Sequence, residues 1–281
     1  MPLQGLPLDL SVPRVMGILN VTPDSFSDGG RFVAPEDALA QAARMVDEGA
    51  DILDIGGEST RPGAAAVSLE EEMDRVLPLV ERLAAEFEVP VSVDTSKPEL
   101  MRTAVAAGAR MINEVSALRA AGAIETVATL DVPVCLMHMQ GQPRTMQAAP
   151  QYEDVLADIL QYLDNRVDAC VAAGIARERL LIDPGFGFGK TLRHNLALLR
   201  GLDHFRRLGL PLLVGISRKS MLGTITGRPV GERLVASVAA ALIAVERGAR
   251  IVRVHDVAAT VDALKLWRAV TDEKWDAGNG D

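Results

Sequence analysis

Short apolar runs alternate with longer amphipathic stretches along the whole chain. The short runs are rich in Val, Ile and Leu, which favour strands, whereas the longer stretches repeat their apolar residues with the period of a helix. Helices are predicted in most intervals between the runs, most clearly at residues 68–87, 154–173 and 231–247. The pattern predicts strands at residues 14–20, 51–56, 89–95, 111–116, 132–138, 180–184, 211–217 and 250–255.

The order of these elements predicts an α/β fold. Eight strand–helix units without a composition break favour a TIM (β/α)8 barrel over residues 1–281, with its active site at the C-terminal ends of the strands. We expect one domain, with a short N-terminal extension over about 1–13 and a tail over about 273–281. A doubly wound open sheet is the alternative, and the strand count disfavours it.

Composition narrows the function classes. The net charge is −9 and the pI about 5.1, without a basic stripe, which argues against binding to nucleic acid or to an anionic membrane. The N-terminus lacks a signal-peptide pattern, and the longest apolar run, 238–245, is too short to span a bilayer. We therefore expect a cytoplasmic protein whose two cysteines, Cys135 and Cys170, are reduced and buried.

A glycine-rich turn at 183–190, DPGFGFGK, ends in Gly-Lys-Thr like a phosphate-binding P-loop. The P-loop spacing requires a glycine where Pro184 stands, and proline has no N–H to offer a phosphate. The turn is therefore not expected to hold phosphate, and Lys190 is expected to be only a charge at the start of the next helix.

Polar residues follow every predicted strand, where a TIM barrel carries its active site. Any one of them would serve as a helix cap, but eight independent caps are a poor explanation for the set. Two long loops, 18–32 and 56–64, are typical of binding loops or lids. The polar residues are Asn20, Asp54, Glu58, Asp94, Asn113, His138, Asp183, Ser217, Lys219, Arg253 and His255.

Two kinds of chemistry are predicted from this set. Arg253 and His255 lie two apart on one strand and hence on one face, so they fit an anionic group such as diphosphate, although Arg253 could instead pair with a carboxylate and His255 be simply buried. Acceptors at Asp94, Asn113 and Asp183 fit a flat heterocycle. A glycosidase would also use two carboxylates, but aromatic sugar platforms are scarce. His194 and His204 read as surface residues.

Seven ordered motifs resemble those of the dihydropteroate synthase family over about 240 residues. One segment departs, since INEVSA carries Glu114 and Ala117 where the family is expected to have Asp and Gly. The motifs are NVTPDSFSDGG, DIGGESTRPGA, VSVDTSKP, LMHMQG, DPGFGFGK, GISRKSM and RVHDV.

The resemblance implies a reaction that joins 6-hydroxymethyl-7,8-dihydropterin diphosphate to 4-aminobenzoate, giving 7,8-dihydropteroate and diphosphate. It implies a pterin site of Asp94, Asn113, Met137, Asp183, Gly215 and Lys219. It implies diphosphate binding by Asn20, Thr60, Arg61, Arg253 and His255, with Mg²⁺ on Asn20. It implies aminobenzoate binding by Phe26, Pro62, Phe188 and Ser220, and catalytic roles for Asn20, Asp94, Lys219, Arg253 and His255.

A homodimer is implied in the same way, with the apolar run 234–245 as interface or as barrel packing. Substitution is expected to be dissociative, with lid closure excluding water. Two alternatives stay open: a pterin-binding methyltransferase domain, which needs no diphosphate clamp, and a non-catalytic pterin-binding paralogue.

Overall fold

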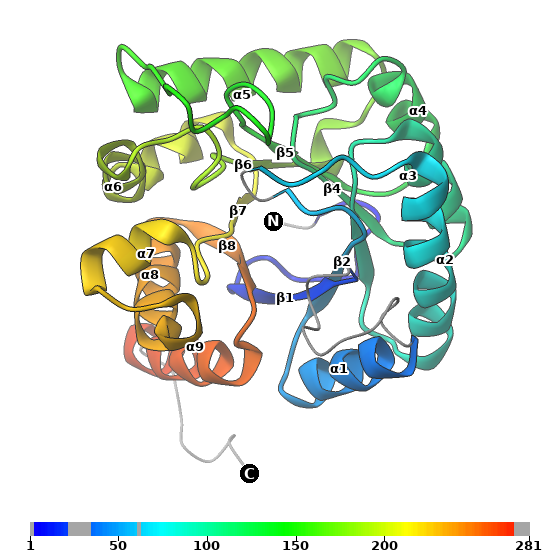
Figure 1. Cartoon of the computed structure of the whole chain (residues 1–281), viewed down its shortest axis with the longest axis horizontal. Coiled ribbons are helices and arrows are strands. Elements are labelled where there is room, and N and C mark those ends of the chain that lie inside the picture. Colours follow the sequence, from blue (N-terminus) through cyan, green and yellow to red (C-terminus); the bar gives the residue numbers. More distant parts are fainter. Residues whose placement is uncertain (1–2, 22–34, 61–62, 273–281) are drawn as a thin grey trace.

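Eight parallel strands close into a barrel in the computed structural model, which describes residues 3–21, 35–60 and 63–272 (Figure 1). Each strand pairs with its sequence neighbours, and β1 pairs with β8, so the described sheet has no open edge. The strands are β1 (Arg14–Asn20), β2 (Ile52–Gly56), β3 (Val91–Asp94), β4 (Met111–Glu114), β5 (Val134–Met137), β6 (Leu180–Asp183), β7 (Leu212–Val214) and β8 (Ala249–Val254).

The α-helices form a ring outside the barrel (Figure 1). They are α1 (Pro35–Asp47), α2 (Leu69–Glu86), α3 (Pro98–Ala106), α4 (Ala123–Thr129), α5 (Val155–Ala172), α6 (Leu192–Arg200), α7 (Ser220–Thr226), α8 (Leu234–Glu246) and α9 (Val257–Thr271). Short 3₁₀ helices are η2 (Arg177–Arg179), η3 (Leu202–Leu208) and η4 (Val230–Glu232). No helix in the described ranges is long and apolar enough to cross a membrane.

The closed barrel confirms the predicted fold and excludes the open sheet. Every predicted strand is present, and the predicted strands at 89–95, 132–138 and 211–217 are shorter at both ends; their last residues already belong to the loops at the barrel mouth. The three clearest predicted helices are present within three residues of their predicted ends, as α2, α5 and α8.

The base of the barrel is closed by the N-terminal segment. Apolar side chains from seven strands fill the barrel interior at this level, and Leu3, Leu6 and Leu10 pack against them. The backbone N–H of Gln4 donates to the carbonyl of Glu178 (3.0 Å), which ties the segment to the barrel. The segment expected as an extension is therefore part of the core.

Leu10→Ala should lower the free energy of unfolding by about 2–5 kcal/mol, since Leu10 is only 1% exposed and its loss leaves a cavity under the barrel. Urea denaturation measures the change. Leu8→Ala is the matched control, because Leu8 is only partly buried, and its loss should be smaller. Equal losses in both variants would contradict the packing of the N-terminal segment against the base of the barrel.

Candidate active site

Strand alternation builds the site directly above the apolar base. Side chains two residues apart on a strand share a face, so Asp54 and Asn113 point inward above Ile52 and Met111 of the base. Asp183 lies in the same way above Leu181, and Arg253 above Ile251. The barrel interior therefore changes from apolar to polar within two residues along each of these strands.

Arg253 joins two of the carboxylates at this level. Its Nε lies 2.6 Å from Oδ2 of Asp54, and its Nη2 lies 3.1 Å from Oδ2 of Asp94. Asn113 donates to the same Asp54 oxygen (3.1 Å). Asp54 is fully buried, and its Oδ1 has no hydrogen-bond partner among the described residues. Asp54 thus orients both the guanidinium of Arg253 and the side-chain amide of Asn113.

The charges at the mouth are unbalanced toward the negative. Burial raises the pKa of Asp94 to about 7, opposed by Arg253 and reinforced by Asp54. Burial lowers the pKa of Lys219 to about 8, opposed by the nearby Asp183 carboxylate. Among the described side chains of this layer, the carboxylates of Asp54, Asp94 and Asp183 outnumber the cations of Arg253 and Lys219. The layer thus favours a ligand that donates hydrogen bonds or develops positive charge.

The loop after β6 forms one wall of the site. Asp183 Oδ1 accepts from the backbone N–H of Gly185 (2.7 Å), and burial raises the pKa of Asp183. Gly185 has φ +71°, and a Cβ there would lie 1.9 Å from the carbonyl oxygen of His138, so only glycine fits. Lys219 Nζ lies 4.4 Å from the centre of the Phe188 ring and donates to the carbonyl of Phe186.

The expectation that Lys190 is only a charge at the start of the next helix is wrong. Lys190 is only 3% exposed, and its Nζ lies 2.9 Å from both His138 Nδ1 and the Phe188 carbonyl oxygen. Burial lowers the pKa of Lys190 well below its usual value and that of His138 to about 2. Lys190 is a buried donor that holds the Phe188 loop against the end of β5.

His194 is also not simply a surface residue. Its ring is partly buried and packs edge-on against Tyr152, with the ring centroids 5.0 Å apart. With Thr191 it forms a capping box that starts α6. His204 is exposed, as predicted.

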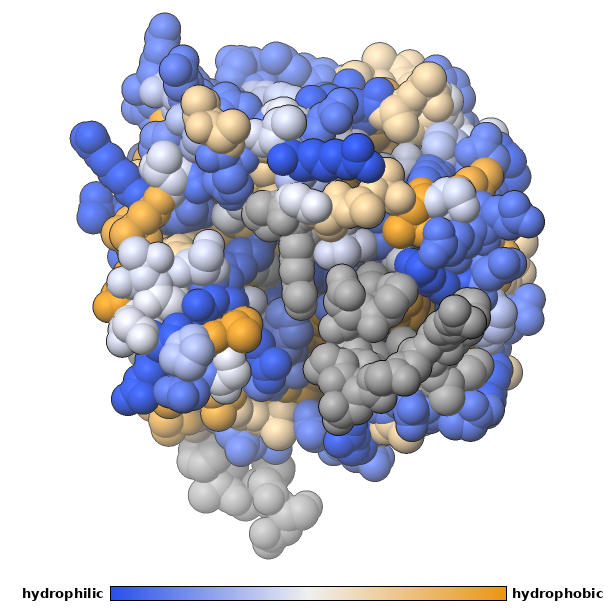
Figure 2. Space-filling model, viewed as in Figure 1, coloured by the Kyte–Doolittle hydropathy of each residue, from blue (hydrophilic) through white to orange (hydrophobic). Residues whose placement is uncertain are grey.

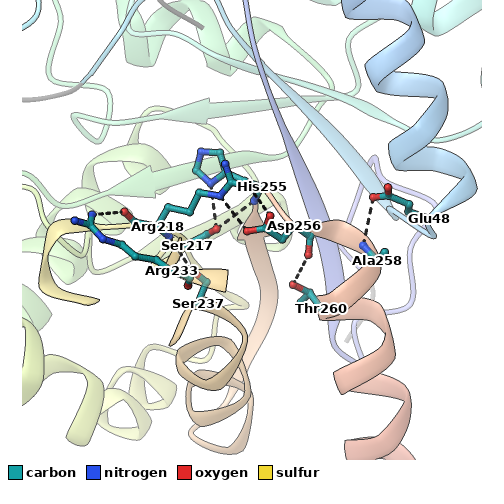
Figure 3. A network of polar contacts seen from close by, with 9 residues as sticks. All are labelled: Glu48, Ser217, Arg218, Arg233, Ser237, His255, Asp256, Ala258 and Thr260. Carbon is teal, nitrogen blue, oxygen red and sulfur yellow. Dashed lines mark hydrogen bonds and ion pairs between the residues drawn. The ribbon is translucent and has the colours of Figure 1, made fainter. Parts of the chain in front are cut away.

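The loop after β7 lies beside this wall and meets the end of β8 (Figure 3). Ser217 Oγ lies 3.0 Å from Nδ1 of His255, which lies directly beyond β8. The guanidinium of Arg218 binds both carboxylate oxygens of Asp256, with Nε 3.0 Å from Oδ2. These contacts fix the loop that presents Lys219 and Ser220.

Glu114 has a structural role. It lies in the segment INEVSA, which differs from the expected family motif. Burial raises its pKa, and its carboxylate accepts from the backbone N–H (3.0 Å) and hydroxyl (2.6 Å) of Ser116 and from the N–H of Leu118. Ala117 and Leu118 have φ of 55° and 56°, a region that costs non-glycine residues energy. Glu114 therefore stabilises a turn that Ala117 makes less favourable than glycine would.

Comparisons with known proteins place the chain in a family. A family described as pterin binding enzyme matches residues 16–255. The dihydropteroate synthase of Escherichia coli (strain K12) is 55% identical over 271 residues, covering 96% of this chain and 96% of that protein. The chain belongs to the dihydropteroate synthase family. The resemblance read from the motifs is confirmed, and the chain is an enzyme of this family.

Solved dihydropteroate synthases share the fold over nearly the whole chain. The Yersinia pestis enzyme with a sulfonamide drug complex has a TM-score of 0.92 and 54% sequence identity, covering 96% of this chain and 98% of that one. The Xanthomonas albilineans enzyme in complex with 7,8-dihydropteroate has a TM-score of 0.83 and 52% identity, covering 94% of each chain.

Most of the residues that the dihydropteroate synthase motifs single out surround the barrel mouth. Asn20 and Asp94 both lie beside Gly56, at 3.4 Å (Oδ1) and 3.9 Å (Cβ) from the position a Cβ would take there. Met137 lies in an apolar cluster against which Phe188 packs, and Gly215 lies beside Arg253. Thr60 ends a described segment at the mouth, whereas Phe26, Arg61 and Pro62 lie outside the described residues.

Two residues of this dihydropteroate synthase site were given no role from sequence. The sequence marks Asp54 only as one of the polar strand-end residues, yet it joins Arg253 to Asn113. The signal was a carboxylate sharing the inward face of an otherwise apolar run. Lys190 has a simple explanation as a charge at a helix start, and no sequence pattern indicates its burial.

Proposed function

We propose that this chain condenses 6-hydroxymethyl-7,8-dihydropterin diphosphate with 4-aminobenzoate to give 7,8-dihydropteroate and diphosphate. The observation that carries the proposal is the cluster in which Asp54 and Asp94 bind Arg253 beside Asn113, because it puts acceptors for a heterocycle next to a cation for its diphosphate. The Xanthomonas albilineans relative, solved with 7,8-dihydropteroate, supports it.

The pterin is assigned to the buried polar layer. Its amino group and ring N–H groups would donate to Asp94 and Asp183, with Asn113 completing the polar contacts. Lys219 lies beside the Phe188 ring and would donate to a ring acceptor. Met137 and Gly215 would pack on the flat faces, where a glycine permits close approach.

The diphosphate is assigned to the rim above this layer. Asn20 would approach it from the end of β1, and Thr60 and Arg61 from the chain after β2. Arg253 would approach it from β8, and His255 from the position directly after β8. Arg253 uses Nε and Nη2 for its two carboxylates, so Nη1, which has no partner among the described residues, is left for a phosphate oxygen.

Asn20 fits a role as a magnesium ligand. Its Oδ1 faces the barrel mouth beside Gly56, and a hard amide oxygen suits Mg²⁺, which takes only one or two protein ligands together with phosphate oxygens and water. No group of three His, Cys, Asp or Glu side chains in the described segments forms a metal site by itself. Bound there, Mg²⁺ would neutralise charge on the leaving diphosphate.

The 4-aminobenzoate is assigned to the outer part of the mouth. Phe188 would contact its ring, and Ser220 at the start of α7 would bind its carboxylate. Phe26 and Pro62, from the loops after β1 and β2, would complete the pocket. The amine then faces the pterin methylene across the site.

The site's charges suit a dissociative substitution. The C–O bond to the pterin methylene breaks, and the electron pair leaves with diphosphate, which Arg253 stabilises. The cation left on the pterin lies over Asp54 and Asp94, whose net negative charge lowers its energy. The neutral arylamine nitrogen then attacks the methylene and releases one proton, so a strong general base is unnecessary.

Binding of the pterin should depend on pH through Asp94. Its pKa is raised to about 7 in the free protein, and only the ionised carboxylate accepts from the pterin, so affinity falls as pH drops below 7. We expect 6-hydroxymethyl-7,8-dihydropterin to bind about tenfold more weakly at pH 6 than at pH 7.5, measured by calorimetry. Asp94→Asn should remove this dependence, and a flat profile in the unaltered protein would contradict the assignment.

Product formation separates the alternatives. Protein incubated with both substrates and Mg²⁺ should yield 7,8-dihydropteroate, detected by mass spectrometry. Pterin binding without product would instead indicate a non-catalytic paralogue. Methyl transfer from a methylated pterin to a corrinoid, without use of 4-aminobenzoate, would indicate the methyltransferase alternative.

The proposal also includes a homodimer. It further includes a reducing, cytoplasmic location. Exposed apolar side chains on the neighbouring helices α8 and α9 include Val235 (80% exposed) and Val270 (77%), whereas the face in Figure 2 is mostly hydrophilic. Both cysteines are buried free thiols, as suits a reducing compartment.

Val235→Glu should shift a dimer to monomer in light scattering, because it places a charge in the apolar contact. Val171→Glu on α5 is the control, since Val171 is also exposed (42%) but lies on another helix, and it should leave the dimer intact. An unaltered protein that is monomeric at micromolar concentration would contradict the dimer.

A further inference from the structure

One hydroxyl contacts His255 at two points. Ser217 Oγ lies 3.2 Å from the backbone nitrogen of His255 and 3.0 Å from its ring Nδ1 (Figure 3). Ser217 is only 7% exposed. Its Oγ has no other hydrogen-bond partner among the residues that the structure describes.

The protons in this contact can be counted. A backbone N–H only donates, so Ser217 Oγ accepts from it. The hydroxyl proton then has one available acceptor, Nδ1 of His255, provided that Nδ1 carries no proton itself. If Nδ1 were protonated, the buried hydroxyl proton would be left without an acceptor, which is unfavourable.

We propose that Ser217 is a positioning residue that fixes His255 in the tautomer with its proton on Nε2. The inference rests on the proposed function, in which His255 binds the diphosphate. With Nδ1 occupied by Ser217, the opposite edge of the ring presents an N–H donor. A phosphate oxygen needs a donor, so the tautomer decides whether the ring attracts or repels the leaving group.

The loop that carries Ser217 is held from two helices. The N–H of Arg218 donates to Ser237 Oγ on α8 (2.9 Å), and Arg233 Nη1 donates to the carbonyl of Arg218 (3.0 Å). The Arg218 side chain binds Asp256, immediately before α9, and Arg218 itself has φ 58°. This unfavourable conformation is fixed by these contacts, so Ser217 is held against His255 rather than left to turn away.

The tautomer can be read without any assay of turnover. The chain has four histidines, so ¹⁵N-histidine labelling gives four ring systems, and His255→Gln identifies the one at the site. We expect the His255 ring of the ligand-free protein to show a protonated Nε2 and an unprotonated, hydrogen-bonded Nδ1. A protonated Nδ1 would overturn the proposal even if the enzyme turns over, and even if no variant at Ser217 folds.

Variants distinguish the effect of the Ser217 hydroxyl from the effect of the loop that carries it. Ser217→Ala should give a mixture of tautomers and raise the KM for the pterin diphosphate about tenfold, leaving the KM for 4-aminobenzoate within about twofold. Ser217→Thr, which keeps the hydroxyl, should restore both the tautomer and KM. Ser237→Ala is the control, because it loosens the same loop without touching His255, and it should keep the tautomer.

Each outcome decides a separate question. An unchanged tautomer in Ser217→Ala would overturn the proposal. The expected tautomer together with no synthase activity would instead count against the proposed function and leave the assignment of Ser217 intact.

Discussion

Arg253→Ala should lower kcat for the condensation by about 10³-fold or more, because a charge that stabilises the leaving diphosphate is lost. The same change leaves Asp54 and Asp94 buried without their cation, and Asp54 is fully buried. Breaking a buried pair by removing one partner costs about 3–5 kcal/mol, so we expect the free energy of unfolding to fall by that amount. Steady-state kinetics and urea denaturation measure the two effects.

The diphosphate role is isolated by comparing ligands. Arg253→Ala should weaken binding of the pterin diphosphate far more than binding of 6-hydroxymethyl-7,8-dihydropterin, which lacks the diphosphate. Arg250→Ala is the matched control, because Arg250 lies on the same strand but donates to Ser11 at the barrel base (2.9 Å). Equal weakening of the two ligands would show that Arg253 serves only to neutralise its carboxylates.

Asp183→Asn should lower the affinity for 6-hydroxymethyl-7,8-dihydropterin by about 100-fold and leave the affinity for inorganic diphosphate unchanged. The amide keeps the shape of the carboxylate, and its oxygen can still accept from the N–H of Gly185 (2.7 Å in the unaltered protein). Its NH₂ group, however, faces a ring donor where the carboxylate offered an acceptor, and an unpaired buried donor costs about 1–3 kcal/mol. Calorimetry with each ligand measures both affinities.

The control for this substitution is Asp131→Asn. Asp131 is exposed and lies before β5 at the barrel base, away from the mouth, so the change should affect neither ligand. If Asp183→Asn weakened the pterin and the diphosphate equally, the division of the site into a pterin layer and a diphosphate rim would be wrong.

The barrel could be predicted from sequence because its signal is local and repeated. Each strand is a short apolar run, each helix has an apolar face, and the count of units selects a closed barrel. The ends of the strands have no such signal, since the last residues of runs such as 211–217 are apolar or small but already turn away from the sheet. The packing of Leu3, Leu6 and Leu10 under the barrel has no such local signal.

The site was predicted in its position but not in its pairings. Polar residues at strand ends meet at one mouth in any barrel, so Asp94, Asn113 and Asp183 could be placed from topology alone. The Arg253–Asp54 pair joins residues 199 positions apart. Its existence depends on strand stagger and rotamers, which no spacing along the chain encodes.

Like the side-chain pairings, the burial of charged residues could not be predicted from the sequence. Lys190 and Glu114 look like ordinary charged residues beside turns, yet both are buried and hold loop backbone through hydrogen bonds. A charged residue is buried only where partners converge from distant segments. For Lys190 these include His138, which is 52 positions away.

The central claim is that one barrel mouth binds both substrates and expels diphosphate as the arylamine attacks. The most direct test follows diphosphate release from 6-hydroxymethyl-7,8-dihydropterin diphosphate with Mg²⁺, with and without 4-aminobenzoate. Release should be sustained only when 4-aminobenzoate is present, in equal amounts with 7,8-dihydropteroate. Absence of release, or release at the same rate without 4-aminobenzoate, would contradict the proposed function.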